Sequence, residues 1–415
     1  MREMKDSGLQ WAGDIPQYWN IAKGKHFMAV LERPVRDDDN VITCFRDGEV
    51  TLRSNRREDG FTVATVEAGY QGIEPGDLVV HGMDGFAGAI GISDSRGKGT
   101  PALNVLSCSE NKKYIMYLLR AMAYTEVFMA LSTGIRVRTC DTNWKKLKSL
   151  DYLIPPADEQ QCIADFLDAK CAEIDALTAD IQTQIDTLEQ YKRSVITETV
   201  TKGLNPNAEM KDSGIQWIGN MPAHWDVVRG KYILHYMQKP VREDDGVITC
   251  FRDGEVTLRS NRREDGFTMS DKEIGYQGID VGDLVVHGMD GFAGSIGISD
   301  SRGKASPVLN VLDTDQCKRY IMYYLRSMAY SDVFLALATG IRVRSCDLRW
   351  NKLAELSYPV PPLDEQNAIV KHIDSVLSKA DAVIADKKAQ LATLDEYKKS
   401  LIFEYVTGKK EVPVS

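Results

Sequence analysis

Apolar and polar residues follow two different patterns along the chain. In residues 1–154 and 205–360, short β-branched and aromatic runs alternate with Asp-Gly and other Gly-rich turns. The two runs that flank Asp47-Gly48 are typical of a β-hairpin. One amphipathic helix is expected over about residues 114–131, because apolar residues recur there with helical spacing. Both regions are therefore predicted to be mixed α/β domains.

Residues 155–204 and 361–415 show the second pattern, which indicates long helices. After two consecutive prolines, Asp158 can cap a helix N-terminus, and no further Gly or Pro follows until Gly203. A helix of about 40 residues is predicted there. The second of these regions repeats the arrangement, so the chain is expected to contain two such helices.

Every seventh residue of the first long helix is apolar, which indicates a seam that packs against a partner helix. The second helix carries a weaker seam, with Lys387 where Ile181 stands. At ~1.5 Å per residue, the first helix carries the chain ~50 Å from the first domain, so an antiparallel partner needs no long return span. The predicted seam residues are Leu167, Ile174, Leu177, Ile181, Leu188, Ile373, Val376, Val383, Leu394 and Leu401, supported in the second helix by Leu377, Ile384 and Leu391.

The whole arrangement is an internal duplication. Val41–Thr62 recurs without one difference as Val247–Thr268, displaced by 206 residues, and this offset holds without insertion from Met4 to Thr201. We therefore predict an α+β protein with two similar domains, two long antiparallel coiled-coil helices and an approximate two-fold axis. Such symmetry would suit a two-fold partner such as duplex DNA.

Charge is distributed unevenly over the 415 residues. The net charge of −9 would by itself argue against a nucleic-acid surface. However, residues 157–192 carry a net charge of −7 and residues 363–399 a net charge of −1. The globular domains are therefore nearly neutral, and residues 136–148 and 342–352 are basic segments that could face phosphate groups.

The densest cationic cluster combines arginine and asparagine, which read base edges, with a hydroxyl group for phosphate. It occupies residues 53–57 and recurs at residues 259–263. An equally weighted alternative is a solvated loop whose arginines pair with Glu58 and Asp59. The candidate DNA-binding residues are Arg53, Ser54, Asn55, Arg56, Arg57, His81, Arg136, Arg138, Lys145, Arg259, Ser260, Asn261, Arg262, Arg263, His287, Arg342 and Arg344.

Signatures of catalysis and metal binding were sought along the whole sequence. It contains no GxxxxGK[ST] loop, no HExxH and no Asn-Pro-Pro-aromatic motif. His81 and Asp84 could form an acid–base pair, but no nucleophile accompanies them, so structural or DNA-contacting roles are favoured. The spacing of the eight cysteines does not fit a zinc or redox site. We expect no catalytic residues, no metal and reduced thiols.

No apolar stretch approaches the ~18 residues of a membrane span, and residues 1–10 lack the apolar core of a secretion signal. A cytoplasmic location without membrane contact is therefore expected.

Several segments resemble the DNA-specificity subunit of type I restriction-modification enzymes. They are the opening MKDSGLQWAGDIPQYW, the run GDLVVHGMDG, the segment STGIRVR, and IPPADEQQCIADFLDAK leading into a long helix that contains LEQYKRSVITETVTKGL. All of them recur in the second half, so the resemblance covers essentially the whole chain.

The resemblance implies a division into four regions. Residues 1–154 and 205–360 would be target-recognition domains that each read half of a bipartite DNA site. Residues 155–204 and 361–415 would be conserved helical regions that set the spacing and dock two methyltransferase subunits. Family members usually carry two dissimilar recognition domains, whereas these are nearly the same, so an interrupted palindrome is the expected target.

The resemblance also implies that the chemistry belongs to other chains. S-adenosylmethionine would be bound by the modification subunits, and ATP and Mg²⁺ by the restriction subunits, which are translocases and nucleases. No cofactor is expected in this chain. Two alternatives remain open, namely an independent nuclease or methyltransferase, and a coiled-coil scaffold or other DNA-binding protein outside a restriction system.

Overall fold

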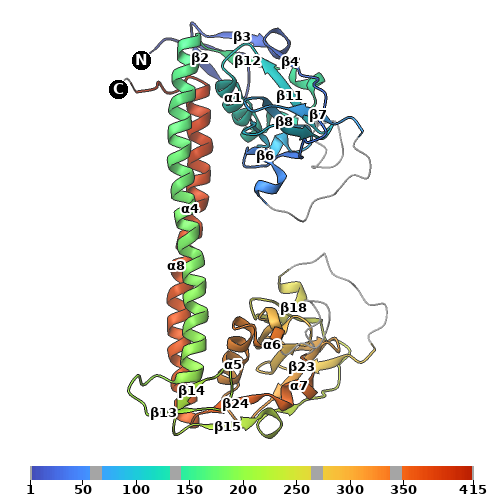
Figure 1. The fold of residues 1–415 in the computed structure, drawn as a ribbon, viewed down its shortest axis with the longest axis vertical. Coiled ribbons are helices and arrows are strands. Elements are labelled where there is room, and N and C mark those ends of the chain that lie inside the picture. Colours follow the sequence, from blue (N-terminus) through green and yellow to red (C-terminus); the bar gives the residue numbers. More distant parts are fainter. Residues whose placement is uncertain (1, 57–67, 131–141, 263–273, 337–347, 414–415) are drawn as a thin grey trace. The chain divides into compact units, whose positions relative to one another are not determined.

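The computed structural model describes residues 2–56, 68–130, 142–262, 274–336 and 348–413. The chain divides into two compact units, and the division falls within each long helix (Figure 1). Unit 1 contains residues 1–181 and 388–415, and unit 2 contains residues 182–387. The sequence repeat therefore differs from the folded unit, because each unit combines one domain with half of each helix.

A four-stranded antiparallel sheet in the order β4-β11-β8-β9 forms the centre of unit 1. Three further strand pairs, β1-β2, β3-β12 and β7-β10, accompany the predicted hairpin β5-β6. The strands are β1 (Met4–Asp6), β2 (Asp14–Pro16), β3 (Asn20–Lys23), β4 (Met28–Val30), β5 (Ile42–Cys44), β6 (Val50–Leu52), β7 (Gln71–Ile73), β8 (Leu78–His81), β9 (Ile90–Ile92), β10 (Gly97–Gly99), β11 (Leu103–Cys108) and β12 (Asp151–Ile154). The short helices are α1 (Lys112–Tyr124), α2 (Val127–Ala130) and α3 (Trp144–Leu147).

Unit 2 repeats this topology, with the central sheet in the order β16-β23-β20-β21. Its strands are β13 (Met210–Asp212), β14 (Asn220–Pro222), β15 (Asp226–Arg229), β16 (His235–Tyr236), β17 (Ile248–Cys250), β18 (Val256–Leu258), β19 (Gln277–Ile279), β20 (Leu284–His287), β21 (Ile296–Ile298), β22 (Gly303–Ala305), β23 (Leu309–Asp313) and β24 (Ser357–Val360). Its short helices are α5 (Lys318–Tyr330), α6 (Val333–Ala336) and α7 (Trp350–Glu355). The predicted pair of similar mixed domains is confirmed.

The alternation of side chains along β8 builds a core on both faces of the sheet. Leu78 and Val80 pack with α1 and the long helices, whereas Val79 packs with the hairpin β5-β6 on the other face. The hairpin turns at Gly48, whose φ of +88° suits glycine, and the buried Arg120 donates to its carbonyl oxygen at 3.0 Å. The sheet is thus covered on both faces.

The prediction of one continuous amphipathic helix over residues 114–131 is wrong. The structure breaks it into α1 and α2, because Glu126 adopts a left-handed φ of +60°. The hydroxyl of Thr125 donates back to the carbonyl of Ala121 at 2.8 Å and helps to end α1.

The two long helices, α4 (Ala157–Lys202) and α8 (Leu363–Val406), are antiparallel in each unit. In unit 1, Phe166 stacks near Tyr405 at 4.4 Å between ring centroids, and Asp175 pairs with Lys398 at 2.6 Å. In unit 2, Lys192 pairs with Asp381 at 2.6 Å. Within the described ranges, no helix is long and apolar enough to cross a membrane.

The helix seam differs from the predicted one in its second row. Leu167, Ile174 and Ile181 are buried, but the residues beside them on the seam are four positions on, at Cys171 and Ile185. Leu177 lies three positions after the buried Ile174, and Val383 lies three positions after the buried Ala380. Their side chains are 47% and 45% exposed, so their assignment to the seam was wrong. The row of Leu177 includes Lys170 and Gln184, and the row of Ile185 includes Thr178 and Lys192, so both rows mix apolar and polar residues. The sequence pattern alone therefore did not say which row faces the partner helix.

Unit 1 is completed by the end of the chain, so both termini lie in it (Figure 1). Tyr114 on α1 donates to the carbonyl of Val406 at 3.2 Å, and Arg2 pairs with Glu411 at 2.9 Å. Trp19, which is fully buried, packs beside Gly408, two residues after the end of α8. In unit 2 the end of α4 packs into the core in the same way, and Tyr320 on α5 donates to the carbonyl of Val200 at 3.0 Å.

Candidate nucleic-acid interface

Three loops of unit 1 meet at the end of β8. The turn of the hairpin β5-β6 is tied to the turn after β8 by an ion pair between Arg46 and Asp84 at 2.8 Å. Thr142, which follows segment 131–141, donates from its hydroxyl to the carbonyl of His81 at 2.8 Å. The hairpin turn, the turn after β8 and the backbone at Thr142 are therefore brought to one edge of the sheet.

The first part of the arginine cluster is anchored to the hairpin rather than free in a loop. Residues 53–55 form a 3-10 helix, and Arg53 donates through Nε to the hydroxyl of Thr43 at 3.3 Å. Asn55 donates its amide to the buried Thr51 at 2.8 Å. Ser54 is exposed beside them. These contacts fix the direction of the segment that leads to Arg56.

Arg56 is oriented by an aromatic ring and two carboxylates. Its guanidinium lies 4.3 Å from the centroid of Phe45 and pairs with Asp47 at 2.6 Å and Glu49 at 3.2 Å. The partners considered in the alternative, Glu58 and Asp59, lie outside the described residues. Arg56 still keeps 36% of its side chain exposed, so it can reach a ligand that competes with the carboxylates.

The second repeat reproduces this cluster closely. Arg262 lies 4.2 Å from the ring of Phe251 and pairs with Asp253 at 2.7 Å. Arg259 donates to Thr249 at 3.2 Å, and Asn261 to Thr257 at 2.8 Å. Ser260 is exposed. Six candidates lie outside the described residues, namely Arg57, Arg136, Arg138, Arg263, Arg342 and Arg344.

His81 shapes the turn that follows β8. Its Nδ1 accepts hydrogen bonds from the backbone N–H groups of Met83 at 3.2 Å and Asp84 at 3.1 Å. Burial lowers the pKa of His81, which keeps the ring neutral so that Nδ1 can accept. His287 makes the same contacts and its pKa is lowered for the same reason. The histidine holds a tight turn whose tip, Met83, is 60% exposed.

Two other arginines form ion pairs near the start of β8, at the opposite end of that strand from His81, and are structural. Arg96 pairs with Asp39 at 2.9 Å, and its hydrogen bonds lower the pKa of that buried carboxyl group to about 2. Arg33 pairs with Asp77. Within the described part of the chain, no group of three His, Cys, Asp or Glu side chains is placed to hold a metal ion.

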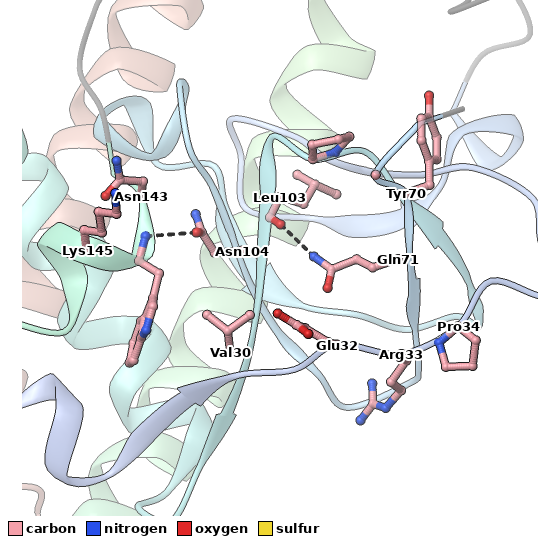
Figure 2. Close-up of a pocket in the computed structure, with 13 residues that line it drawn as sticks. Val30, Glu32, Arg33, Pro34, Tyr70, Gln71, Leu103, Asn104, Asn143 and Lys145 are labelled. Carbon is pink, nitrogen blue, oxygen red and sulfur yellow. Dashed lines mark hydrogen bonds between the residues drawn. The ribbon is translucent and has the colours of Figure 1, made fainter. Parts of the chain in front are cut away.

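A pocket of about 720 Å³ opens beside the turn, between the end of β4 and α3 (Figure 2). Asn104 on β11 fixes one wall, because it accepts from the backbone N–H of Trp144 at 3.1 Å and donates to the carbonyl of Thr142 at 3.1 Å. Lys145, one of the candidates, lies at the rim and is exposed. Glu32 and Gln71 point into the pocket (Figure 2).

Sequence reasoning missed Arg46, Met83 and the pocket residues other than Lys145. Arg46 and Met83 stand in runs that are identical in the two repeats, which was a usable signal. The pocket has no such signal, because its walls come from four segments that lie 30 or more residues apart in the sequence.

A second surface lies on the helix pair. In unit 1, Leu177 of α4 and Tyr397 of α8 are 47% and 55% exposed, and in unit 2, Tyr191 and Val383 are 51% and 45% exposed. All four occupy the same place in the seven-residue repeat, immediately before a seam residue. In an antiparallel pair such positions of the two helices flank the same side of the seam. The domain packs elsewhere on the pair, since Asp168 binds Lys113 of α1 at 2.5 Å.

The chain was compared with known protein families, curated proteins and solved structures. No protein-family model matches the chain. The type I restriction enzyme MjaX specificity subunit of Methanocaldococcus jannaschii is 24% identical over 444 residues, covering 96% of this chain and 95% of that protein. The type I restriction enzyme StySPI specificity subunit of Salmonella potsdam is 19% identical over 427 residues, covering 96% and 90%.

A solved chain from a study of complex assembly and conformational transition of a type I restriction-modification system shares the fold. Its TM-score is 0.66 at 13% sequence identity, and the match covers 95% of this chain and 99% of that one. The resemblance inferred from the repeated sequence segments is confirmed.

Proposed function

We propose that this chain is the DNA-specificity subunit of a type I restriction-modification enzyme. The observation that carries the proposal is the duplicated loop edge, in which both units hold the same arginine, asparagine and histidine contacts. Relatives named as specificity subunits match over 90% or more of their own length, which supports the same role for the whole chain. In this role the chain binds DNA in the cytoplasm and makes no contact with a membrane.

Each unit binds one half of a bipartite DNA site through its loop edge. Arg46 and Arg56 project from the hairpin and can contact guanine edges or phosphate groups. In unit 1, the exposed Lys145 adds a further cation at the neighbouring pocket, whereas unit 2 has Asn351 at this position. Because Arg46 and Arg56 recur in unit 2 as Arg252 and Arg262 with the same partners, the two units select the same bases at these contacts, and an antiparallel helix pair favours reading them on opposite strands.

The chain does not itself catalyse DNA methylation or cleavage. Modification subunits bring S-adenosylmethionine and methylate adenine, and restriction subunits bring ATP and Mg²⁺ for translocation and cleavage. The sequence, which lacks nucleotide-binding and amino-methyltransferase motifs, supports this division.

The exposed apolar side of the helix pair binds the modification subunits, one in each unit. Leu177 and Tyr397 supply that side in unit 1, and exposed apolar side chains on helices are typical of a surface that a partner covers. Changing both to serine should release one modification subunit without unfolding the pair. Ala172→Ser and Ala176→Ser, which are exposed changes on the outer face of α4, are the control.

Purified chain, alone and with its modification subunits, tests the assignment. The chain alone should bind no S-adenosylmethionine and cleave no DNA, and the complex should retain DNA that contains its site. Binding of S-adenosylmethionine by the chain alone would instead favour a methyltransferase. Assembly of the complex without DNA retention would favour a coiled-coil scaffold.

A further inference from the structure

The lining of the pocket beside α3 differs between the two repeats along one wall. Its constant wall, formed by Tyr70, Gln71 and Trp144, recurs in the second repeat, as does the neighbouring turn at residues 81–85. Its variable wall does not recur. Val30, Glu32 and Lys145 of the first repeat are replaced by Tyr236, Gln238 and Asn351 in the second.

The first replacement places an aromatic ring where the first repeat has an open wall. Tyr236 stacks on Trp350, with 5.9 Å between ring centroids and an interplanar angle of 27°. Trp350 is the counterpart of Trp144, which lines the pocket of unit 1 next to the smaller Val30. A flat group can therefore lie against Trp144, whereas Tyr236 already covers the face of Trp350.

Gln71 of the pocket and its counterpart Gln277 also differ in how open their surroundings are. Gln71 and Gln277 each donate through Nε2 to a backbone carbonyl, that of Leu103 at 2.9 Å and of Leu309 at 3.1 Å. Gln277 is only 8% exposed, and its Oε1 is buried without a hydrogen-bond partner among the described residues. Gln71 is more exposed and lines the open pocket (Figure 2), so its oxygen can accept a hydrogen bond from a ligand.

The open pocket is acceptor-rich and continuous with the proposed DNA-binding edge. Glu32 is exposed, points inward with Gln71, and has no ion-pair partner among the described residues. Asn104 joins the pocket to the edge, because its amide donates both to Val80 at the end of β8 and to Thr142. A carboxylate accepts from the exocyclic amino group of cytosine, and a glutamine at the same place suits adenine instead.

We infer that Glu32 and Gln71 read a base of the first half-site by accepting from its exocyclic amino group, in the space that the small Val30 leaves open, and that unit 2 lacks this contact. The inference rests on the proposed function. It makes the target an imperfect palindrome, in which bases read by the identical loops match in both halves and one position differs. Glu32 favours cytosine at that position, whereas Gln238, beside the stacked Tyr236, does not.

The test transplants the residues of the second repeat into the first. Val30→Tyr with Glu32→Gln, Glu32→Gln alone, and the control Asp37→Glu are each expressed with the modification subunits, and methylated adenines are mapped. Asp37→Glu is also a change to the second repeat's residue, but outside the pocket. The double variant should shift base preference at one position of one half-site by roughly 5- to 150-fold, towards the base in the other half.

Three outcomes would overturn the inference. The double variant could keep the wild-type motif, it could alter several positions in both halves, or both pocket variants could lose all methylation while the complex remains assembled. Tyr236 and Gln238 stand at these positions in unit 2, where Tyr236 packs on the counterpart of Trp144, so folding of the variant is expected. Failure of the wild-type complex to methylate any defined sequence would refute the proposed function instead.

Discussion

Deleting residues 388–415 should unfold unit 1 even though most of that unit lies more than 200 residues earlier in the chain. The deleted segment inserts four apolar side chains into the core of unit 1, all of them 7% exposed or less, namely Leu401, Ile402, Tyr405 and Val406. Each buried side chain of this size contributes about 1.5–3 kcal/mol, so the four contribute roughly 6–12 kcal/mol. A domain's whole stability is about 5–15 kcal/mol. Loss of the segment should therefore remove most or all of the stability of unit 1.

Hydrogen exchange measured on peptides separates the two units in one experiment. The strands β11 and β23 are equivalent but end in different residues, so their peptides can be told apart by mass. After the deletion, amides of β11 should exchange rapidly while those of β23 stay protected, because unit 2 is completed by the end of α4. Deletion of residues 412–415, which retains Glu411 and its ion pair with Arg2, is the control. Protection of β11 at the wild-type level would refute the discontinuous unit.

Three further changes probe the seam, the interface and an internal ion pair. Ile181→Asp with Leu188→Asp buries unpaired charge on the seam and should melt the helix pair well below the wild-type temperature, as followed by helical circular dichroism; an unchanged melting curve would contradict the seam. Arg56→Ala should weaken binding of the specific site by about 1–3 kcal/mol in a salt-controlled binding assay, whereas equal loss on random DNA would show that Arg56 contacts phosphate only. The lowered pKa of Asp39 beside Arg96 means that its stabilising effect is complete above its unfolded pKa of about 4 and is lost as pH falls towards about 2. Asp39→Asn should thus lower the melting temperature at pH 7 but converge with wild type in acid, and a constant difference would contradict the assignment.

The sequence predicted those helices and turns whose conformation is determined by residues close together in the chain. The hairpin at Gly48 and the long uninterrupted helices followed from turn chemistry and from the absence of Gly and Pro. The break at Glu126 was missed, because a left-handed glutamate carries no distinctive sequence signal. The exposure of Leu177 was missed as well, because both rows beside Ile174 and Ile181 mix apolar and polar residues and helical periodicity did not distinguish them.

The candidate site shows the same limit at longer range. The arginine cluster was found by composition, but its partners Asp47 and Glu49 come from the preceding turn, and only the folded hairpin brings them together. His81 was found as a polar residue in a repeated run, and its role as the acceptor of two turn N–H groups required coordinates. The pocket around Glu32 joins distant segments and could not be read from the sequence.

Single-molecule sequencing of methylated adenine, in cells that carry this chain with its modification subunits, tests the central claim most directly. Two nearly identical readers should produce one interrupted motif whose halves are inverted copies of each other, apart from the position assigned to the Glu32 pocket. Two unrelated half-sites, or two matching half-sites in the same orientation, would contradict the account.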